Sequence, residues 1–197
     1  MKMVKKTTAF ERVVHWVLAI TFIDLTLTGL AFAYTSLNWI NRLYGGNHYA
    51  STCHKWNGVL FLVALVISAY YYLGEALRFG PEDKEWLSKL GGYLDKKAEI
   101  PPQGKMNAGQ KLFYLIFVLL SGLAISASGF MLWAGSSSVG YFLHNLAFFL
   151  MFSFMPLHIY LATAANPGVF RVMTRGTVPL EFAKKHYPKW VKEARLE

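Results

Sequence analysis

The chain has 197 residues, of which 54% are hydrophobic, 16% aromatic and only 16% charged, so its composition differs from that of ordinary soluble domains. Residues 112–170 contain no Asp, Glu, Lys or Arg, and this stretch is long enough for two membrane spans of roughly 20 residues each. The single cysteine, Cys53, excludes an intrachain disulfide.

The first apolar stretch follows a basic N-terminus, as in a cleaved secretion signal. It is longer than the usual apolar region of such a signal, and it carries His15 and Asp24. We therefore expect a retained first helix.

Four apolar stretches in all follow one another along the chain, and each can cross a bilayer as a helix. They cover about residues 13–34, 56–79, 111–133 and 141–165. Because backbone amides cannot stay unpaired in lipid, and no segment alternates like a barrel strand, the expected fold is an all-α bundle of four transmembrane helices. It forms a single membrane domain over residues 1–197.

The connections between the stretches differ in length. Residues 135–140 form a short turn, which makes the third and fourth helices antiparallel neighbours. Residues 80–110 carry several prolines and charges and are expected to form a polar loop, and residues 166–197 a polar tail.

The positive charges fix the expected orientation. Of the 20 Lys and Arg residues, 18 lie in the N-terminal arm, the 78–111 region or the C-terminal tail, whereas Arg42 and Lys55 lie on the opposite side. The positive-inside rule then predicts a multi-pass protein of the bacterial inner membrane with both termini and the 80–110 loop in the cytoplasm. The net charge of +9 is explained by this topology and by attraction to anionic membrane lipid, without nucleic acid.

Four of the six histidines lie within the spans or at their ends, where ligand-capable side chains invite a functional hypothesis. His15 and His158 are expected near the inner face, and His54 and His144 near the outer face. One such histidine alone is as well explained as an interfacial polar residue, but two at each depth favour a shared role. His48 and His186 fall in polar segments and are expected to be solvated surface residues.

The spacing of His144 and His158 indicates what that role is. They are 14 residues apart, which returns to nearly the same helix face roughly 21 Å further along the axis. Neutral imidazole is a strong axial ligand of haem iron, and the interior of a bundle supplies such ligands from facing helices. The pattern predicts two haems, one held by His54 and His144 and the other by His15 and His158.

Small residues provide a second sign of this arrangement. Gly29 follows His15 by 14 positions, and Ser68 follows His54 by 14 positions. Each ligand helix would thus offer a small residue beside the other haem. Gly and Ser are also common at ordinary helix contacts in membranes.

With these residues in place, the chain resembles the cytochrome b (gamma) subunit of membrane-bound respiratory formate dehydrogenases. The resemblance runs from the first helix to the tail, and KMNAGQK (105–111) and FAKKHYPKWVKEA (182–194) are its most specific pieces. The other landmarks are RVVHW (12–16), His54, and the pair of His144 and His158.

This resemblance implies a four-helix anchor with two haems b whose axial ligands match His15, His54, His144 and His158. It also implies that the outer haem receives electrons from the iron-sulphur subunit of a molybdopterin or tungstopterin enzyme. The inner haem would pass them to menaquinone or another quinone. The chain is then an electron-transfer subunit without catalytic residues of its own.

The resemblance also implies a quinone site at Asn107, Gly109 and Gln110, near His158. The two carboxamides can donate hydrogen bonds to a quinone carbonyl, and the Gly109 amide can approach closely because no side chain intervenes. The alternative for Asn107 is helix capping, since Asn before an apolar run is a favoured N-cap.

Four residues fall outside the pattern. Asp24 could join a proton route, contact a partner helix, or form hydrogen bonds within the bundle while protonated, and we favour the last. Pro156 is expected to bend the fourth helix beside His158. Arg12 and Lys55 flank ligands and could neutralise haem propionates, but a cation at the interface explains them slightly better.

Two other functions compete with this reading. A related cytochrome could serve a nickel-iron hydrogenase or another molybdenum or tungsten oxidoreductase. A protein of a different class, a haem-free transporter or scaffold, could use the histidines and Asp24 as a proton or metal path. Haem content and the identity of copurifying subunits discriminate among the three.

Overall fold

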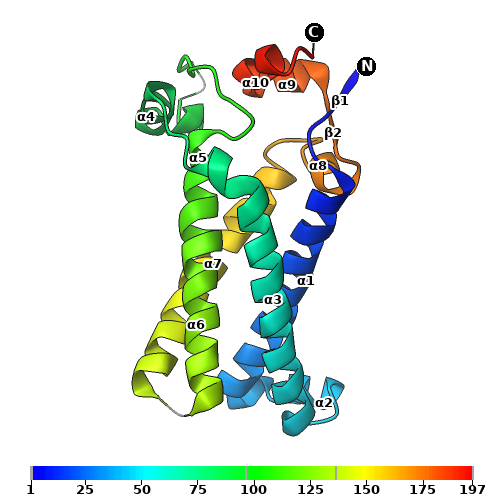
Figure 1. The fold of residues 1–197 in the computed structure, drawn as a ribbon, viewed down its shortest axis with the longest axis vertical. Coiled ribbons are helices and arrows are strands. Elements are labelled where there is room, and N and C mark those ends of the chain that lie inside the picture. The colour runs from blue at the N-terminus through cyan, green and yellow to red at the C-terminus, as the bar shows by residue number, and fades with distance from the viewer. Residues whose placement is uncertain (1, 96, 136, 197) are drawn as a thin grey trace.

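The computed structural model describes residues 2–95, 97–135 and 137–196, and it is mainly helical (Figure 1). The elements in chain order are β1 (Met3–Lys5), α1 (Ala9–Ala33), η1 (Thr35–Leu37), α2 (Trp39–Leu43), α3 (Asn47–Ala76), α4 (Pro81–Ser88), η2 (Leu90–Gly92), α5 (Ala108–Leu112), η3 (Phe113–Leu120), α6 (Ser121–Ala134), α7 (Ser138–Ala162), α8 (Arg171–Thr174), β2 (Thr177–Pro179), α9 (Leu180–His186) and α10 (Pro188–Glu193). Among the described residues, four helices are long and apolar enough to cross a membrane: Ala9–Ala33, Asn47–Ala76, Ala108–Ala134 and Ser138–Ala162. The predicted fold of four helical spans is confirmed, but the chain is mainly helical rather than all-α, because it also contains the paired strands β1 and β2.

The bundle has two distinct ends (Figure 1). One end carries both chain termini with β1, β2, α4, α9 and α10, and we call it the inner end. The opposite end carries α2, and we call it the outer end.

Helix α1 begins at a complete capping box. Thr8 Oγ1 accepts from the Glu11 amide at 3.2 Å, and Glu11 Oε2 accepts from the Thr8 amide at 2.7 Å. These two bonds satisfy backbone donors that a helix start otherwise leaves free. The helix then runs without interruption to Ala33, and Tyr34 leaves it in an extended conformation.

Helix α3 begins at Asn47, nine residues before the start at 56 that the sequence suggested, and it ends at Ala76 rather than 79. Gly45 and Gly46 have φ of 88° and 112°, and this non-helical conformation separates α2 from α3. Residues 47–57 contain no Gly or Pro that would interrupt a helix. They are too polar to be recognised from the sequence as part of an apolar span. His54 therefore lies in the third turn of the helix instead of opening it.

The third span consists of α5, η3 and α6, and it begins at Ala108 rather than at 111. Its middle segment, η3, has the wider hydrogen-bonding pattern of a π-helix, a form often found beside functional sites. The fourth span, α7, runs through Pro156 and ends at Ala162, three residues before the expected end.

Apolar side chains cover the outside of the bundle as well as its interior. Ile20, Leu120 and Phe149 expose 63%, 63% and 64% of their surface, as suits contact with lipid. Inside, Phe61, Leu65 and Met151 form the buried cluster between the helices. This packing is typical of a membrane bundle rather than of a soluble domain.

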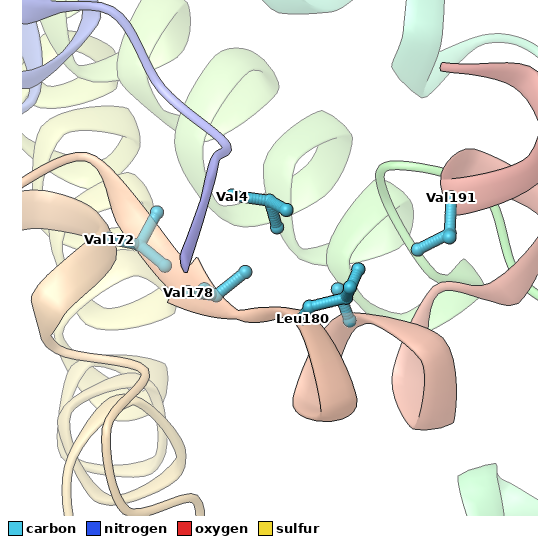
Figure 2. Packing of buried hydrophobic residues seen from close by; sticks show 6 residues of the cluster. Val4, Val172, Val178, Leu180 and Val191 are labelled. Carbon is cyan, nitrogen blue, oxygen red and sulfur yellow. The ribbon is translucent and has the colours of Figure 1, made fainter. Parts of the chain in front are cut away.

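The inner end is closed by a folded cap that the sequence did not predict. Strand β1 pairs antiparallel with β2, so the N-terminal arm and the C-terminal tail form one unit. Figure 2 shows the apolar side chains of this cap converging from both segments. They are Val4, Val172, Val178, Leu180, Ala183 and Val191. Residues 166–197, expected to form a polar tail, are therefore largely structured.

The 80–110 loop also carries structure. It contains the eight-residue helix α4, which is too short to span a bilayer. Asp83 of α4 pairs with Lys111 of α5 at 2.8 Å, with only 2% and 8% of the two side chains exposed. This buried ion pair fastens the loop to the start of the third span.

Candidate functional site

His54 and His144 face each other across the outer half of the bundle. His54 comes from α3 and His144 from α7, and their ring centres are 6.3 Å apart with an angle of 54° between the ring planes. We call the space around this pair the outer site. The predicted pairing of these two histidines agrees with the geometry.

The hydrogen bond of His54 fixes which of its nitrogens is free. Its Nδ1 lies 2.7 Å from Thr28 Oγ1, and the Thr28 hydroxyl donates its own hydrogen to the Asp24 carbonyl at 2.8 Å. The hydroxyl can then only accept from the ring, so Nδ1 carries the proton and Nε2 keeps its lone pair. A metal-binding histidine typically has its second nitrogen held in this way.

His144 reaches the same state through different partners. Its Nδ1 lies 3.1 Å from the Ile125 carbonyl, which can only accept a hydrogen bond, and 3.2 Å from Ser128 Oγ. The Ser128 hydroxyl donates to the Ala124 carbonyl at 2.8 Å. The proton therefore lies on Nδ1 of His144 as well, and Nε2 is the free ligand atom.

A cavity of about 870 Å³ surrounds this pair, which is within the usual range for cofactor sites. Both histidines line it, together with mainly apolar residues of all four spans. Glycines also line it: a Cβ on Gly29 would lie 3.6 Å from His54 Cε1, and one on Gly129 would lie 3.5 Å from His144 Cε1. Only Gly29 was identified from the sequence as such a small residue.

His15 and His158 form a second pair toward the inner end, which we call the inner site. Their ring centres are also 6.3 Å apart, at an interplanar angle of 45°. Phe113 stacks on His158 with ring centres 5.1 Å apart. His15 Nδ1 is buried and has no hydrogen-bond partner among the described residues. The hydroxyl of Ser68, the small residue expected here, lies 3.1 Å from the Tyr114 hydroxyl.

The common spacing of 6.3 Å has a simple chemical meaning. Two imidazoles bound to opposite sides of one metal ion by bonds of about 2.0–2.1 Å have ring centres about 6.3 Å apart, because each nitrogen lies about 1.1 Å from its ring centre. Among the described residues, no group of three or more His, Cys, Asp or Glu side chains could hold a metal ion. Two histidines leave four of the six positions around an octahedral iron ion open, and the macrocycle of haem supplies four nitrogens for them. The residues present therefore fit haem.

The residues of the expected quinone site form the start of α5. Asn107 Oδ1 accepts from the Gln110 amide at 2.9 Å, and Gln110 Oε1 accepts from the Asn107 amide at 3.0 Å. A Cβ on Gly109 would lie 2.7 Å from Trp86, so this position requires glycine unless the indole moves. The side-chain oxygens of Asn107 and Gln110 thus serve the helix cap, which was the alternative to a quinone site. Their side-chain NH2 groups take no part in this cap. Gln110 Nε2 donates to the Tyr187 hydroxyl at 3.4 Å.

Asp24 lies within the bundle and is hydrogen-bonded there. The Tyr44 hydroxyl donates to its Oδ1 and the Asn57 side-chain amide donates to its Oδ2, both at 2.5 Å. Asp24 therefore forms hydrogen bonds within the bundle, as we favoured from the sequence, and both of its oxygens serve as acceptors.

The remaining candidates have local partners. Arg12 Nη1 donates to the Thr7 carbonyl at 3.3 Å, and Lys55 Nζ lies 5.6 Å from the centre of the Trp133 ring. His48 is exposed, as expected. His186 is half-buried rather than fully solvated, and it stacks on Phe182 with ring centres 4.2 Å apart.

Three further residues of the outer site were missed from the sequence: Thr28, Ser128 and Gly129. Thr and Ser in apolar helices usually bond to their own backbone, so nothing in the sequence singles these two out. Gly129 could have been sought as a small residue on the helix that faces His144.

Four membrane-spanning helices with haem-compatible histidine pairs between them define a membrane cytochrome b. The model of the family described as prokaryotic cytochrome b561 matches residues 6–176, and the chain belongs to this family. The cofactor of such a protein is haem b.

Comparison with curated proteins gives relatives of one kind. The cytochrome b556(fdo) subunit of formate dehydrogenase from Escherichia coli (strain K12) is 29% identical over 95% of this chain and 92% of its own length. The cytochrome b556(Fdn) subunit of the nitrate-inducible formate dehydrogenase of the same strain is 29% identical over 98% and 92%. The formate dehydrogenase cytochrome b556 subunit of Haemophilus influenzae (strain ATCC 51907 / DSM 11121 / KW20 / Rd) is 27% identical over 94% and 81%. The resemblance predicted from the sequence is confirmed.

Proposed function

We propose that this chain is the dihaem cytochrome b subunit of a respiratory formate dehydrogenase and conducts electrons across the membrane to a quinone. The observation that carries the proposal is the presence of two separate histidine pairs with the same 6.3 Å spacing. The three relatives described above, all named as formate dehydrogenase subunits, support the choice of enzyme.

The chain supplies the axial ligands and the orientation of each haem. His54 and His144 hold one haem b, and His15 and His158 hold the other. When bound, each haem supplies an iron centre that takes up and gives off one electron. Helix α7 connects the two sites, because it carries His144 and His158 on one face roughly 21 Å apart.

The positive charges support an orientation with the inner end in the cytoplasm. Of the 20 Lys and Arg residues, 18 lie in segments that belong to this end, whereas Arg42 and Lys55 belong to the outer end. We infer that the chain lies in the bacterial inner membrane with both termini in the cytoplasm. The outer site then lies toward the side from which a partner delivers electrons.

The outer end has a surface suited to such a partner. Large apolar side chains are exposed there, between α1 and α3 and in the first turn of α3: Tyr34, Trp39, Leu43 and Tyr49 expose 58%, 56%, 75% and 61% of their surface. Exposed apolar groups beside an electron-transfer site favour a covering subunit. We infer an iron-sulphur subunit there, joined to a molybdopterin or tungstopterin subunit that carries out the oxidation of formate.

The quinone is proposed to bind at Asn107, Gly109 and Gln110. This cap lies one helical turn before Phe113, whose ring stacks on His158 of the inner site. The capping box uses the side-chain oxygens, so the donors toward a quinone carbonyl are the side-chain N–H groups of Asn107 and the one N–H of Gln110 that does not donate to Tyr187. Reduction of menaquinone or another quinone here would take up protons from the cytoplasmic side.

The first experiment is a pyridine haemochrome measurement on the complex purified from its own membranes, with the copurifying subunits identified by mass spectrometry. We expect two haems b per chain, together with an iron-sulphur and a molybdopterin or tungstopterin subunit. A haem-free chain would support a transporter or scaffold and overturn the proposal. A nickel-iron subunit in place of the pterin subunit would overturn the assignment to formate dehydrogenase.

The quinone site is tested with two variants that preserve the helix cap. Asn107→Asp and Gln110→Glu keep the accepting oxygens of the capping box and remove the N–H donors. Loss of one hydrogen bond of about 1–1.5 kcal/mol predicts a roughly tenfold rise in the KM for quinone, with unchanged haem content. Asn47→Asp at the outer end is the matched control. Unchanged quinone kinetics in both variants would assign the site elsewhere.

A further inference from the structure

Asp24 is a charged residue in the middle of a span, and the proposed electron transfer does not use it. Its two oxygens accept hydrogen bonds from Tyr44, which follows α2, and from Asn57 of α3, both at 2.5 Å. A carboxylate placed within apolar helices is costly unless such donors compensate it. Three separate segments therefore hold one carboxyl group at a fixed position.

This charge lies next to the outer site. Asp24 precedes Thr28 by one helical turn on α1, and Asn57 follows His54 by nearly one turn on α3. The bonds Thr28 to His54 and Asn57 to Asp24 therefore form two successive cross-links between the same helices. One turn corresponds to about 5.4 Å along the axis, so the carboxylate lies close to the Nδ1 side of His54.

A second connection runs through the backbone. The Thr28 hydroxyl, which accepts from His54, donates to the carbonyl of Asp24 at 2.8 Å. Any shift of Asp24 therefore changes the acceptor that orients the ring of His54. Groups that orient a ligand histidine and charges near a metal are the means by which a protein tunes that metal.

We propose that Asp24 is a positioning residue of the outer site, whose fixed negative charge lowers the reduction potential of the haem held there. The inference rests on the proposed binding of a haem by His54 and His144. A nearby negative charge stabilises the oxidised iron, which carries one more positive charge than the reduced iron. Because the charge lies beside the outer pair, it acts on that haem and leaves the inner one nearly unchanged.

Tyr44 ties this charge to the outer surface of the protein. Burial and the hydrogen bond to the Asp24 carboxylate raise the pKa of Tyr44 to about 12, so its hydroxyl keeps its proton and remains a donor at physiological pH. The segment that carries Tyr44 is itself anchored, since Asn41 is fully buried and donates to Asn47 Oδ1 at 3.0 Å. The segment that carries the donor is thus anchored to the start of α3.

The test is a redox titration of both haems, followed by their visible spectra, in the intact complex carrying Asp24→Asn. This variant keeps the shape and removes the charge. We expect the potential of one haem to rise by an amount corresponding to a roughly tenfold change in its oxidised-to-reduced ratio, or about 59 mV for one electron. The other haem is expected to stay within a small fraction of that shift. Asp95→Asn, in the exposed part of the 80–110 loop, is the matched control and should shift neither.

Tyr44→Phe is the second variant, because it removes a donor and leaves the charge. In alkaline buffer, where a carboxyl group stays ionised, it should lower the potential of the same haem. Opposite shifts in the two variants support the proposal. Absence of a shift in both, or a rise in both, would overturn it. Haem content is measured in parallel: a wild-type complex with fewer than two haems per chain would contradict the proposed function itself.

Discussion

The outer and inner sites have the same spacing between their histidines, but they hold those histidines in different ways. In the outer site both rings donate from Nδ1, to Thr28 Oγ1 at 2.7 Å and to the Ile125 carbonyl at 3.1 Å. In the inner site His15 Nδ1 has no partner among the described residues, and His158 packs against Phe113. Hydrogen bonds orient one pair, and packing orients the other.

This difference predicts which substitutions disturb the histidine rings of each site. A ring held by hydrogen bonds loses its orientation when a single acceptor is removed. A ring held by packing depends on the elements that position its neighbours, which here are α5 and the cap at the inner end. We therefore expect single polar substitutions to affect the outer haem, and damage to the cap to affect the inner one.

Removal of one histidine ligand from each site is expected to have the largest effect, and it tests whether the two sites bind haem independently. His144→Ala and His158→Ala should each abolish one haem and retain the other, because each variant leaves one site with a single histidine and the other site with both of its histidines. Haem per chain, measured by pyridine haemochrome, should fall from two to one in both variants. His48→Ala, at an exposed position, is the control and should keep both haems. Loss of both haems from either variant would show that the sites do not bind independently.

The second test breaks the buried ion pair that fastens the 80–110 loop to α5, the element that positions Phe113 beside the inner site. Lys111→Met leaves Asp83 charged and unpaired at a position where only 2% of its side chain is exposed. Breaking such a pair costs about 3–5 kcal/mol. We expect a large drop in the thermal stability of the detergent-solubilised complex, with the inner haem released before the outer one.

Its control lies in the same loop. Lys89 and Glu85 form a pair at 2.6 Å whose side chains are 34% and 51% exposed. Exposed pairs of this kind contribute only about 0.3–0.5 kcal/mol. Lys89→Met should therefore leave both the melting temperature and the order of haem release unchanged. Earlier release of the outer haem from Lys111→Met would refute the link between this ion pair and the inner site.

The histidine pairs were predictable from the sequence because helix geometry and depth constrain them. The 14-residue spacing on α7 and the charge asymmetry of the connections sufficed to pair His15 with His158 and His54 with His144. The residues that orient the rings were not predictable. Ser126 and Ser153 bond only to their own helix, at 2.8 Å and 2.7 Å, and nothing local distinguishes them from Ser128.

The cap was missed for a related reason. Strands β1 and β2 have three residues each, and Val4 pairs with Val178 across almost the whole chain. Segments this short carry no periodicity that identifies a strand. Their pairing depends on long-range packing, which a pattern of single residues does not reveal.

The third prediction compares one hydroxyl in each half of the bundle. Thr28→Val removes the acceptor of His54 Nδ1, and loss of such a partner typically weakens metal binding about 10–100-fold, or about 1.4–2.7 kcal/mol. Ser68→Ala removes a hydroxyl bonded to Tyr114 and not to a ligand. Haem retention during dilution in detergent should fall for the outer haem in the first variant and stay unchanged in the second. Equal loss of haem in both variants would contradict the claim that the hydrogen bond to Thr28 orients a ligand of the outer site.

The smallest expected effect concerns the exposed ion pair between Glu82 of α4 and Lys189 of α10. The hydrogen bond from Lys189 lowers the pKa of Glu82, and the same bond raises the pKa of Lys189. A lowered carboxyl pKa stabilises the fold above the unfolded value of about 4.3, and this contribution is lost as the pH falls through the folded pKa. A raised lysine pKa stabilises it below about 10.4, and this contribution is lost as the pH rises through the folded pKa.

The pair should therefore contribute between these two limits, and by only about 0.2–1 kcal/mol because both side chains are partly exposed. A double-mutant cycle with Glu82→Gln and Lys189→Met, followed by thermal unfolding at neutral and at acidic pH, measures it. We expect a coupling at neutral pH that vanishes in acid, with both haems retained throughout. Because this pair joins α10 to α4 without touching a ligand helix, a change in haem retention would mean that the surface contacts of the cap, and not only the buried pair of Asp83 and Lys111, control the inner site.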